Sequence, residues 1–184
     1  MRVERSDILS WEEYEPRRDA IRARAMEEKR VRRVHLGPAL TFLFENAATM
    51  RYQVQEMVRV ERLRRPEEIQ HEVDTYNEVL GGAGELGCTL LVELPDPAER
   101  DARLRAWLDL PGHLYLRLAD GRAVRPVHDG RQVGEDRLSS VQYLKFPVGG
   151  ATPVAVGCDL PALAGEAPLS DEQRRALAAD LRAG

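Results

Sequence analysis

Residues 36–61, with the sequence LGPALTFLFENAATMRYQVQEMVRVE, carry the pattern that decides the fold. In the first half, apolar and more polar positions alternate: Leu40, Phe42 and Phe44 against Thr41, Leu43 and Glu45. This alternation is typical of a half-buried strand, and it places Glu45 on the less apolar face. Asn46 or Thr49 can cap a following helix, whose apolar stripe recurs at helical spacing: Met50, Val54, Met57 and Val58. The stretch therefore predicts a strand that leads directly into an amphipathic helix.

The residues on the N-terminal side of this stretch predict further helix. Ser10 and Glu13 fit a capping box, so a helix should begin there, and Pro16 should restart or kink it. A narrow apolar face then fades into the basic run Lys29–Arg33. Basic side chains suit a helix C-terminus because they oppose the helix dipole. We interpret this run as the exposed end of an N-terminal helix.

The residues on the C-terminal side alternate between helices and strands. Pro66 fits the first turn of a helix that stops near Gly81-Gly82. Apolar alternation predicts strands at 88–94 and 114–118, and apolar runs predict strands at 141–146 and 154–158. Asp96 and Ser170 have the capping pattern of two further helices. The order predicts an α+β fold, in which a mixed or antiparallel sheet is covered by several helices.

The length of 184 residues fits a single compact domain. We expect a helical, basic part at about 1–80, a strand-rich part at about 86–160 and a C-terminal helix at about 170–182. Residues 1–65 hold 15 basic and 11 acidic side chains, and residues 66–184 hold 12 and 20, so the net charges are +4 and −8. This asymmetry fits either complementarity between the two parts or an anionic partner for the basic part.

The composition argues against a membrane or secreted protein. Apolar residues make up 43% of the chain and charged residues 32%, which is a globular mixture. The longest apolar runs are a few residues long, whereas a membrane-spanning helix needs about 20. The first ten residues carry charges throughout, unlike a secretory signal. We therefore expect a cytoplasmic protein with no membrane partner.

The two cysteines, Cys88 and Cys158, both stand next to a glycine in an apolar stretch and lack the Cys-x-x-Cys spacing of zinc or redox sites. Free cysteine behaves as a small apolar residue, so we expect two buried thiols, although the sequence leaves a disulfide open.

The polar residues of the 36–61 stretch are the main site candidates. Glu61 lies seven residues after Val54 and four after Met57, so it is predicted at the end of the apolar stripe, where Arg65 could pair with it. Three further polar residues are expected nearby: Glu45, Gln53 and Glu56. The functional hypothesis is a pocket for a polar ligand or metal, in which Arg51 and Arg59 offer charge to an anion. The alternative is a structural ion-pair network that ties helix to strand.

Other motifs give weaker signals. Lys29, Arg30, Arg32 and Arg33 form a basic patch that could contact nucleic acid, but stacking signatures and phosphate loops are absent. Glu68 and His71 have one copy of the Glu-x-x-His spacing of di-iron proteins, which without a second copy predicts a solvated helix face. Gly81–Gly84 follows a helix, so it predicts a turn. Ser139 and Ser140 lack a nearby base. No metal site is predicted.

Several segments resemble a bacterial family named domain of unknown function 3501. They are Leu36-Gly37-Pro38, Phe44-Glu45, residues 49–57 with Arg59 and Glu61, Asp74–Asn77 and Ser139–Leu144. The resemblance implies no catalytic residues. It implies a gene neighbourhood beside rubrerythrin-like and iron–sulfur oxidoreductase genes, and hence a redox or peroxide-stress setting. Where relatives are expected to end a segment in aspartate-histidine-proline, this chain has Asp159-Leu160-Pro161.

Three hypotheses follow. The first is a cytoplasmic accessory protein that binds a small polar ligand or a partner protein, such as a rubrerythrin-like or iron–sulfur protein, in a redox-related pathway. The second is an enzyme that uses Glu45, Glu56 or Glu61 as acid, base or metal ligand. The third is a nucleic-acid-binding module built on the basic N-terminal helix. A homo-oligomer is compatible with all three.

Overall fold

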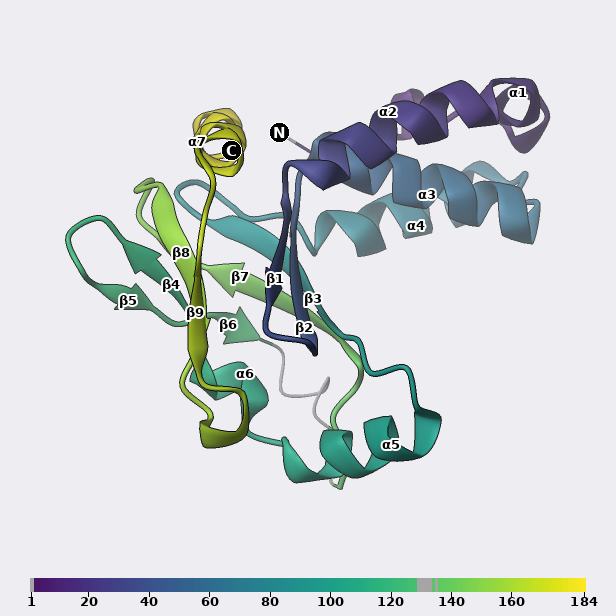
Figure 1. Cartoon of the computed structure of the whole chain (residues 1–184). Coiled ribbons are helices and arrows are strands. Elements are labelled where there is room, and N and C mark those ends of the chain that lie inside the picture. The colour runs from purple at the N-terminus through teal and green to yellow at the C-terminus, as the bar shows by residue number, and fades with distance from the viewer. Residues whose placement is uncertain (1, 129–133, 135) are drawn as a thin grey trace.

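The alternating apolar segments form antiparallel strands, and the capped segments form helices (Figure 1). The computed structural model describes residues 2–128, 134 and 136–184. The α-helices are α1 (Trp11–Tyr14), α2 (Arg18–Arg30), α3 (Ala47–Glu61), α4 (Pro66–Asn77), α5 (Pro97–Ala106), α6 (Leu110–His113) and α7 (Asp171–Ala183). The strands are β1 (Arg33–Leu36), β2 (Leu40–Glu45), β3 (Leu86–Val92), β4 (Leu114–Leu118), β5 (Ala123–Val124), β6 (Val127–His128), β7 (Val141–Phe146), β8 (Pro153–Cys158) and β9 (Gly165–Pro168).

The strands form two sheets. One has the order β1-β2-β3-β7-β6, and the other has the order β5-β4-β8-β9. Every pairing in both sheets is antiparallel. The prediction of an α+β domain with antiparallel strands and several helices is therefore confirmed, although the strands are divided between two sheets.

The two sheets share one apolar core. Phe42, Phe44 and Leu90 contribute from the first sheet, and Leu116 and Val156 from the second. Helices α5 and α7 close the core with Leu104 and Leu177, each fully buried. Cys88 and Cys158 belong to the same core as free, buried thiols, as predicted. The apolar faces that the sequence alternation predicts for the strands are the faces that line this core.

A second apolar cluster holds the N-terminal helices together. Val54 and Val58 of α3 pack with Ile69 and Val73 of α4, so these helices use the stripes expected from their sequence. Figure 1 shows α2, α3 and α4 grouped beside one end of the β1–β2–β3 part of the sheet. Strand β2 is buried along its whole length and not only on one face, and α2 is among the elements in contact with it.

The starts of the helices follow the capping chemistry of the sequence. Asn46 is the N-cap of α3: its Oδ1 accepts from the amide N of Thr49 at 3.0 Å, and Thr49 Oγ1 accepts from the amide N of Asn46 at 3.0 Å. Ser10 and Ser170 form equivalent capping boxes for α1 and α7. The reciprocal bonds fix where each helix begins.

Among residues 2–128, 134 and 136–184, no helix has both the length and the apolar character needed to cross a bilayer.

Candidate ligand site at Glu45

Glu45 is the last residue of β2, and its side chain is almost fully buried, with 6% of the residue exposed. Its neighbour across the sheet is Gly87 of β3. A Cβ atom at Gly87 would lie 2.2 Å from the carbonyl oxygen of Val79, so only glycine lets the segment after α4 cross the sheet so closely. The residue paired with Glu45 is therefore covered closely by backbone of the segment between α4 and β3.

The Glu45 carboxyl has one satisfied and one unsatisfied oxygen. Oε1 accepts a hydrogen bond from Thr89 Oγ1 at 2.8 Å. Oε2 is buried and has no hydrogen-bond partner among the described residues. The Thr49 hydroxyl lies close enough to the carboxyl to lower its pKa, and it donates a hydrogen bond to the Asn46 carbonyl at 3.0 Å. Buried polar atoms are nearly always paired, so an unpaired carboxyl oxygen calls for an explanation, such as protonation of the carboxyl, a bound water or a bound ligand.

Burial raises the pKa of Glu45. The hydroxyls of Thr49 and Thr89 and the charges of Lys29 and Arg32 act in the opposite direction but do not cancel the effect. The neutral carboxyl is thereby favoured relative to that of a free glutamate. A neutral carboxyl can donate as well as accept a hydrogen bond, which widens the range of polar groups that Glu45 can contact.

A recess of about 220 Å³ opens beside this carboxyl, and we call it the Glu45 recess. It lies between the start of α3, the turn after α4 and the end of α7; its polar or flexible lining includes Glu45, Asn46, Gly81, Glu85, Gly87 and Asp180. Ligand sites usually have volumes of roughly 300–1,000 Å³, so this one suits a compact molecule.

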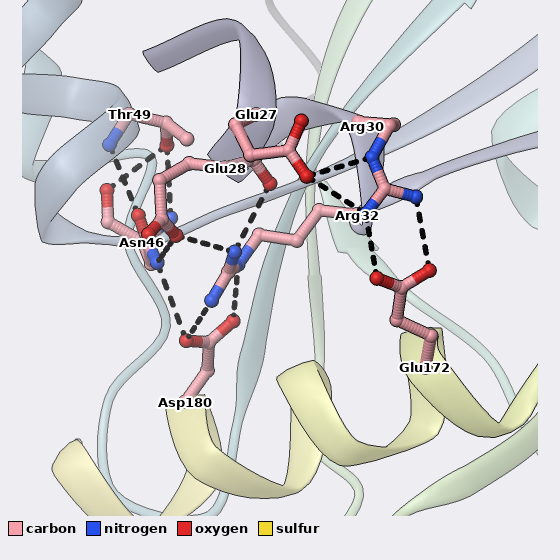
Figure 2. Close-up of polar contacts among 8 residues, drawn as sticks. All are labelled: Glu27, Glu28, Arg30, Arg32, Asn46, Thr49, Glu172 and Asp180. Carbon is pink, nitrogen blue, oxygen red and sulfur yellow. Dashed lines mark hydrogen bonds and ion pairs between the residues drawn. The ribbon is translucent and has the colours of Figure 1, made fainter. Parts of the chain in front are cut away.

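The wall of the recess is fixed by Arg32, which follows α2 and is 6% exposed. Figure 2 shows its guanidinium between Glu28 of α2 and Asp180 of α7. Arg32 Nε and Nη2 donate to the two carboxylate oxygens of Asp180 at 2.8 and 2.9 Å, and Nη1 donates to Glu28 Oε2 at 2.6 Å. Asn46 Nδ2 lies 3.4 Å from one oxygen of each acid. This network holds Asp180 and the cap of α3 in place around the recess.

Glu56 lies in a different cluster from Glu45. Its carboxylate accepts from Tyr14 Oη at 2.6 Å and from Nε and Nη2 of Arg18 at 2.9 Å each. Ten residues of helix separate Asn46 from Glu56, a rise of about 15 Å along α3. The predicted convergence of Glu45 and Glu56 is therefore wrong. Glu56 instead forms a structural ion-pair network, although this network ties α3 to α1 and α2 and not to a strand as the alternative interpretation expected.

Glu61 is exposed, so its predicted place on the buried stripe is also wrong. The stripe ends at Val58, and Val60 is already 64% exposed. Arg62 then adopts a left-handed conformation with φ of 52°, which ends the helix. Arg65, the expected partner of Glu61, pairs with Glu68 instead.

The other ligand candidates are dispersed. Arg59 lies 3.7 Å from Glu56 and 3.8 Å from Glu15, as part of the Glu56 cluster. Gln53 is half-buried on α3, away from the residues that line the Glu45 recess. Arg51 is exposed and lines a separate recess between α2 and α3. Of the six residues predicted for one pocket, only Glu45 lines the Glu45 recess.

Two of the four basic-patch residues, Arg30 and Arg32, form ion pairs within the chain. Arg30 pairs with Glu27 at 2.8 Å and Glu172 at 2.6 Å, and Arg32 is the buried residue described above rather than part of an exposed helix end. Lys29 Nζ lies 5.5 Å from the centre of the Tyr52 ring. Arg33 is exposed on β1. The α2–α7 pairs favour charge complementarity within the chain over an anionic partner at these residues.

Sequence reasoning missed three contributors to the Glu45 recess. The position of Thr89 could be predicted once β2 and β3 are paired, because alternation in both strands places it on the same face as Glu45. Gly87 is an isolated glycine in a strand, a feature that is typical of a close approach by another backbone but does not point to Glu45. Asp180 lies 135 residues from Glu45 and has no local signal. In the described part of the chain, no group of three or more metal-ligating side chains occurs, including around Glu68 and His71.

Comparison with known proteins places the chain in a family. A family profile described as "Protein of unknown function (DUF3501)" matches residues 2–181. The chain belongs to this family. It is also similar to a solved structure of a novel protein of unknown function from Burkholderia pseudomallei K96243, with 29% sequence identity and a TM-score of 0.90. That match covers 98% of this chain and 100% of the other. Among curated proteins, none matches.

In this DUF3501 chain, Asp159 has a histidine partner although no histidine follows it in sequence. His113 Nδ1 lies 2.7 Å from Asp159 Oδ1, and Arg125 pairs with the other oxygen. The hydrogen bonds from Arg125 and His113 lower the pKa of Asp159 to about 2. The imidazole therefore comes from the end of α6, on a segment that local sequence does not connect with Asp159.

Proposed function

We propose that the protein is a binding protein that holds a small polar ligand in the Glu45 recess. The observation that carries the proposal is the Glu45 Oε2 atom, which is buried, has no described hydrogen-bond partner and belongs to a residue lining the recess. A ligand that donates a hydrogen bond to this oxygen would remove the cost of leaving it unpaired, which is about 1–3 kcal/mol.

The neighbouring groups restrict the chemistry of the ligand. Asp180 is occupied by Arg32, and Glu85 Oε2 accepts from the amide N of Gly82 at 3.0 Å. Glu45 differs from these two acids because its unpaired oxygen is buried, next to backbone groups and small side chains. This environment favours a compact alcohol, amine or amide over a large charged substrate.

An enzyme that uses clustered glutamates is less well supported. Acid–base pairs need two carboxyl groups within reach of the same substrate atoms, whereas Glu45, Glu56 and Glu61 have separate surroundings. A redox role through this chain's own thiols is also disfavoured, because burial raises the pKa of both Cys88 and Cys158. The redox-pathway setting and a rubrerythrin-like or iron–sulfur partner stay predictions that rest on the resemblance alone.

The test is a thermal-shift and calorimetric titration with ethanolamine, ethylene glycol and acetamide as probes. At least one probe should stabilise the wild-type protein saturably, and Glu45→Leu should abolish that effect. Glu61→Gln is the matched control, because it alters an exposed carboxyl on the same strand–helix unit. The proposal fails if no probe binds, or if Glu45→Leu binds like the wild type while remaining folded by circular dichroism.

A further inference from the structure

A second recess, of about 390 Å³, lies between the N-terminal segment, α2 and α3. Figure 1 shows α2 and α3 side by side at this place. Small residues, Ala25 of α2 and Ala48 of α3, are part of its lining. Leu9, Ile21 and Tyr52 add apolar surface to the same recess. We call it the Arg24–Arg51 recess.

Two guanidinium groups line this recess from opposite helices. Arg24 is on α2 and Arg51 on α3, and both are exposed. Neither has a hydrogen bond or ion pair with a described residue, although many arginines of this chain are paired. Two unpaired cations at one recess repel each other, and a shared anion would relieve this repulsion.

Two further basic side chains lie beside Tyr52, which lines the recess. Lys29 Nζ lies 5.5 Å from the centre of the Tyr52 ring, and Arg22 Nη1 donates to Tyr52 Oη at 3.4 Å. Two acids also line the recess, and each has a hydrogen-bond partner outside it, although Asp7 keeps its negative charge. Glu28 pairs with Arg32, and Asp7 accepts from the amide N of Glu4 at 2.9 Å. Arg24 and Arg51 therefore remain available to an incoming group.

From this arrangement we infer that the Arg24–Arg51 recess is a binding site for a small oxyanion, a carboxylate or phosphate, attached to an apolar body. The planar guanidinium fork matches both oxyanions, and an apolar body would cover Leu9 and Ile21. The site is independent of the Glu45 recess in its ligand chemistry, although Ala48 lines both.

Isothermal titration at low ionic strength with octanoate and with phenyl phosphate tests this inference. At least one probe should bind saturably with one site per chain, and added salt should weaken it. The double variant Arg24→Gln/Arg51→Gln should weaken binding at least tenfold. Binding of octanoate alone identifies a carboxylate site and binding of phenyl phosphate alone a phosphate site, and either result supports the inference.

Two control variants make the result specific. Arg33→Gln removes an exposed arginine outside the recess and should change the affinity less than twofold. Glu45→Gln should also leave it unchanged, which separates this site from the Glu45 recess. The inference is overturned if neither probe binds saturably, or if Arg33→Gln weakens binding as much as the double variant does. Circular dichroism and the melting temperature show that each variant is folded.

Discussion

Arg32 and Asp180 form a two-fold hydrogen-bonded ion pair across 148 positions of sequence, with Nε to Oδ2 at 2.8 Å and Nη2 to Oδ1 at 2.9 Å (Figure 2). The exposed fractions of the two side chains are 7% and 14%. The pair joins Arg32, which lies two residues after the end of α2, to the C-terminal helix. Glu28 forms a further ion pair with the same guanidinium group. Helix α7 is thus tied to the N-terminal part by charge, while its Leu177 packs in the core that the two sheets share.

Replacing Arg32 with alanine should destabilise the protein by about 3 kcal/mol, because removing one partner leaves Asp180 poorly solvated and unpaired. Urea unfolding monitored by circular dichroism measures the change. Arg30→Ala is the matched control: it breaks the exposed Arg30–Glu172 pair between the same two helices and should have a much smaller effect. Equal losses in the two variants would contradict the importance of the buried pair.

The Tyr14–Glu56 contact predicts a specific acid sensitivity. Burial alone would raise the pKa of Glu56, but hydrogen bonds from Arg18 and Tyr14 and the charge of Arg59 outweigh it and lower the pKa below 4.5. The stabilisation that the ionised Glu56 provides is therefore present above pH 4.5 and is lost as the pH falls through the lowered pKa of Glu56. Glu56→Gln should flatten this part of the curve of unfolding free energy against pH.

Tyr14→Phe tests the same cluster at neutral pH. Tyr14 is fully buried, and the substitution removes its hydroxyl while keeping the ring. Loss of a hydrogen bond to a charged group should cost about 2 kcal/mol in urea unfolding. An unchanged midpoint of unfolding would show that the Arg18 contacts alone satisfy Glu56.

Glu45 should show the opposite pH dependence from Glu56. Its pKa is raised by burial, so its contribution to stability is fully present below pH 4.5 and is lost as the pH rises through the raised pKa. Glu45→Gln cannot ionise, so the stability of this variant relative to wild type should be greater at pH 8 than at pH 5. Chemical denaturation at both pH values measures the difference. The same difference at pH 5 and pH 8 would argue that Glu45 stays in one protonation state throughout.

The sequence predicts the individual elements of this fold better than their assembly. Capping residues such as Ser10, Asn46 and Ser170 act within three positions, so the chain itself contains both partners of each cap. Short strands such as β5 and β6, of two residues each, are too brief for a periodic pattern. The division into two sheets depends on which strands pair, and alternation alone does not determine this.

The candidate site shows the same limit. Strand alternation identifies Glu45 as a candidate, but it does not predict that the residue is buried like the rest of its strand. The predicted place of Glu61 extends the helical spacing past Val58, which is the last buried residue of α3. Helical periodicity shows which face a residue occupies, whereas burial also requires a neighbouring element at that level of the helix.

The last prediction concerns Gly157 and Tyr115, which face each other across β8 and β4. A Cβ atom at Gly157 would lie 2.2 Å from Tyr115 Cζ, so the tyrosine ring lies directly over the glycine. The ring also stacks with Arg117, whose guanidinium carbon is 4.9 Å from the ring centre, and Tyr115 Oη donates to Glu166 at 3.0 Å. Gly157→Ala should displace the ring and destabilise the protein by about 2 kcal/mol.

In a Tyr115→Ala background the clash is absent, so the second substitution, Gly157→Ala, should be neutral or mildly stabilising, because alanine reduces the entropy of the unfolded chain. A double-mutant cycle by urea unfolding measures the coupling between the two positions. Additive losses would contradict the contact, because they would mean that the cost of alanine at position 157 does not depend on the ring.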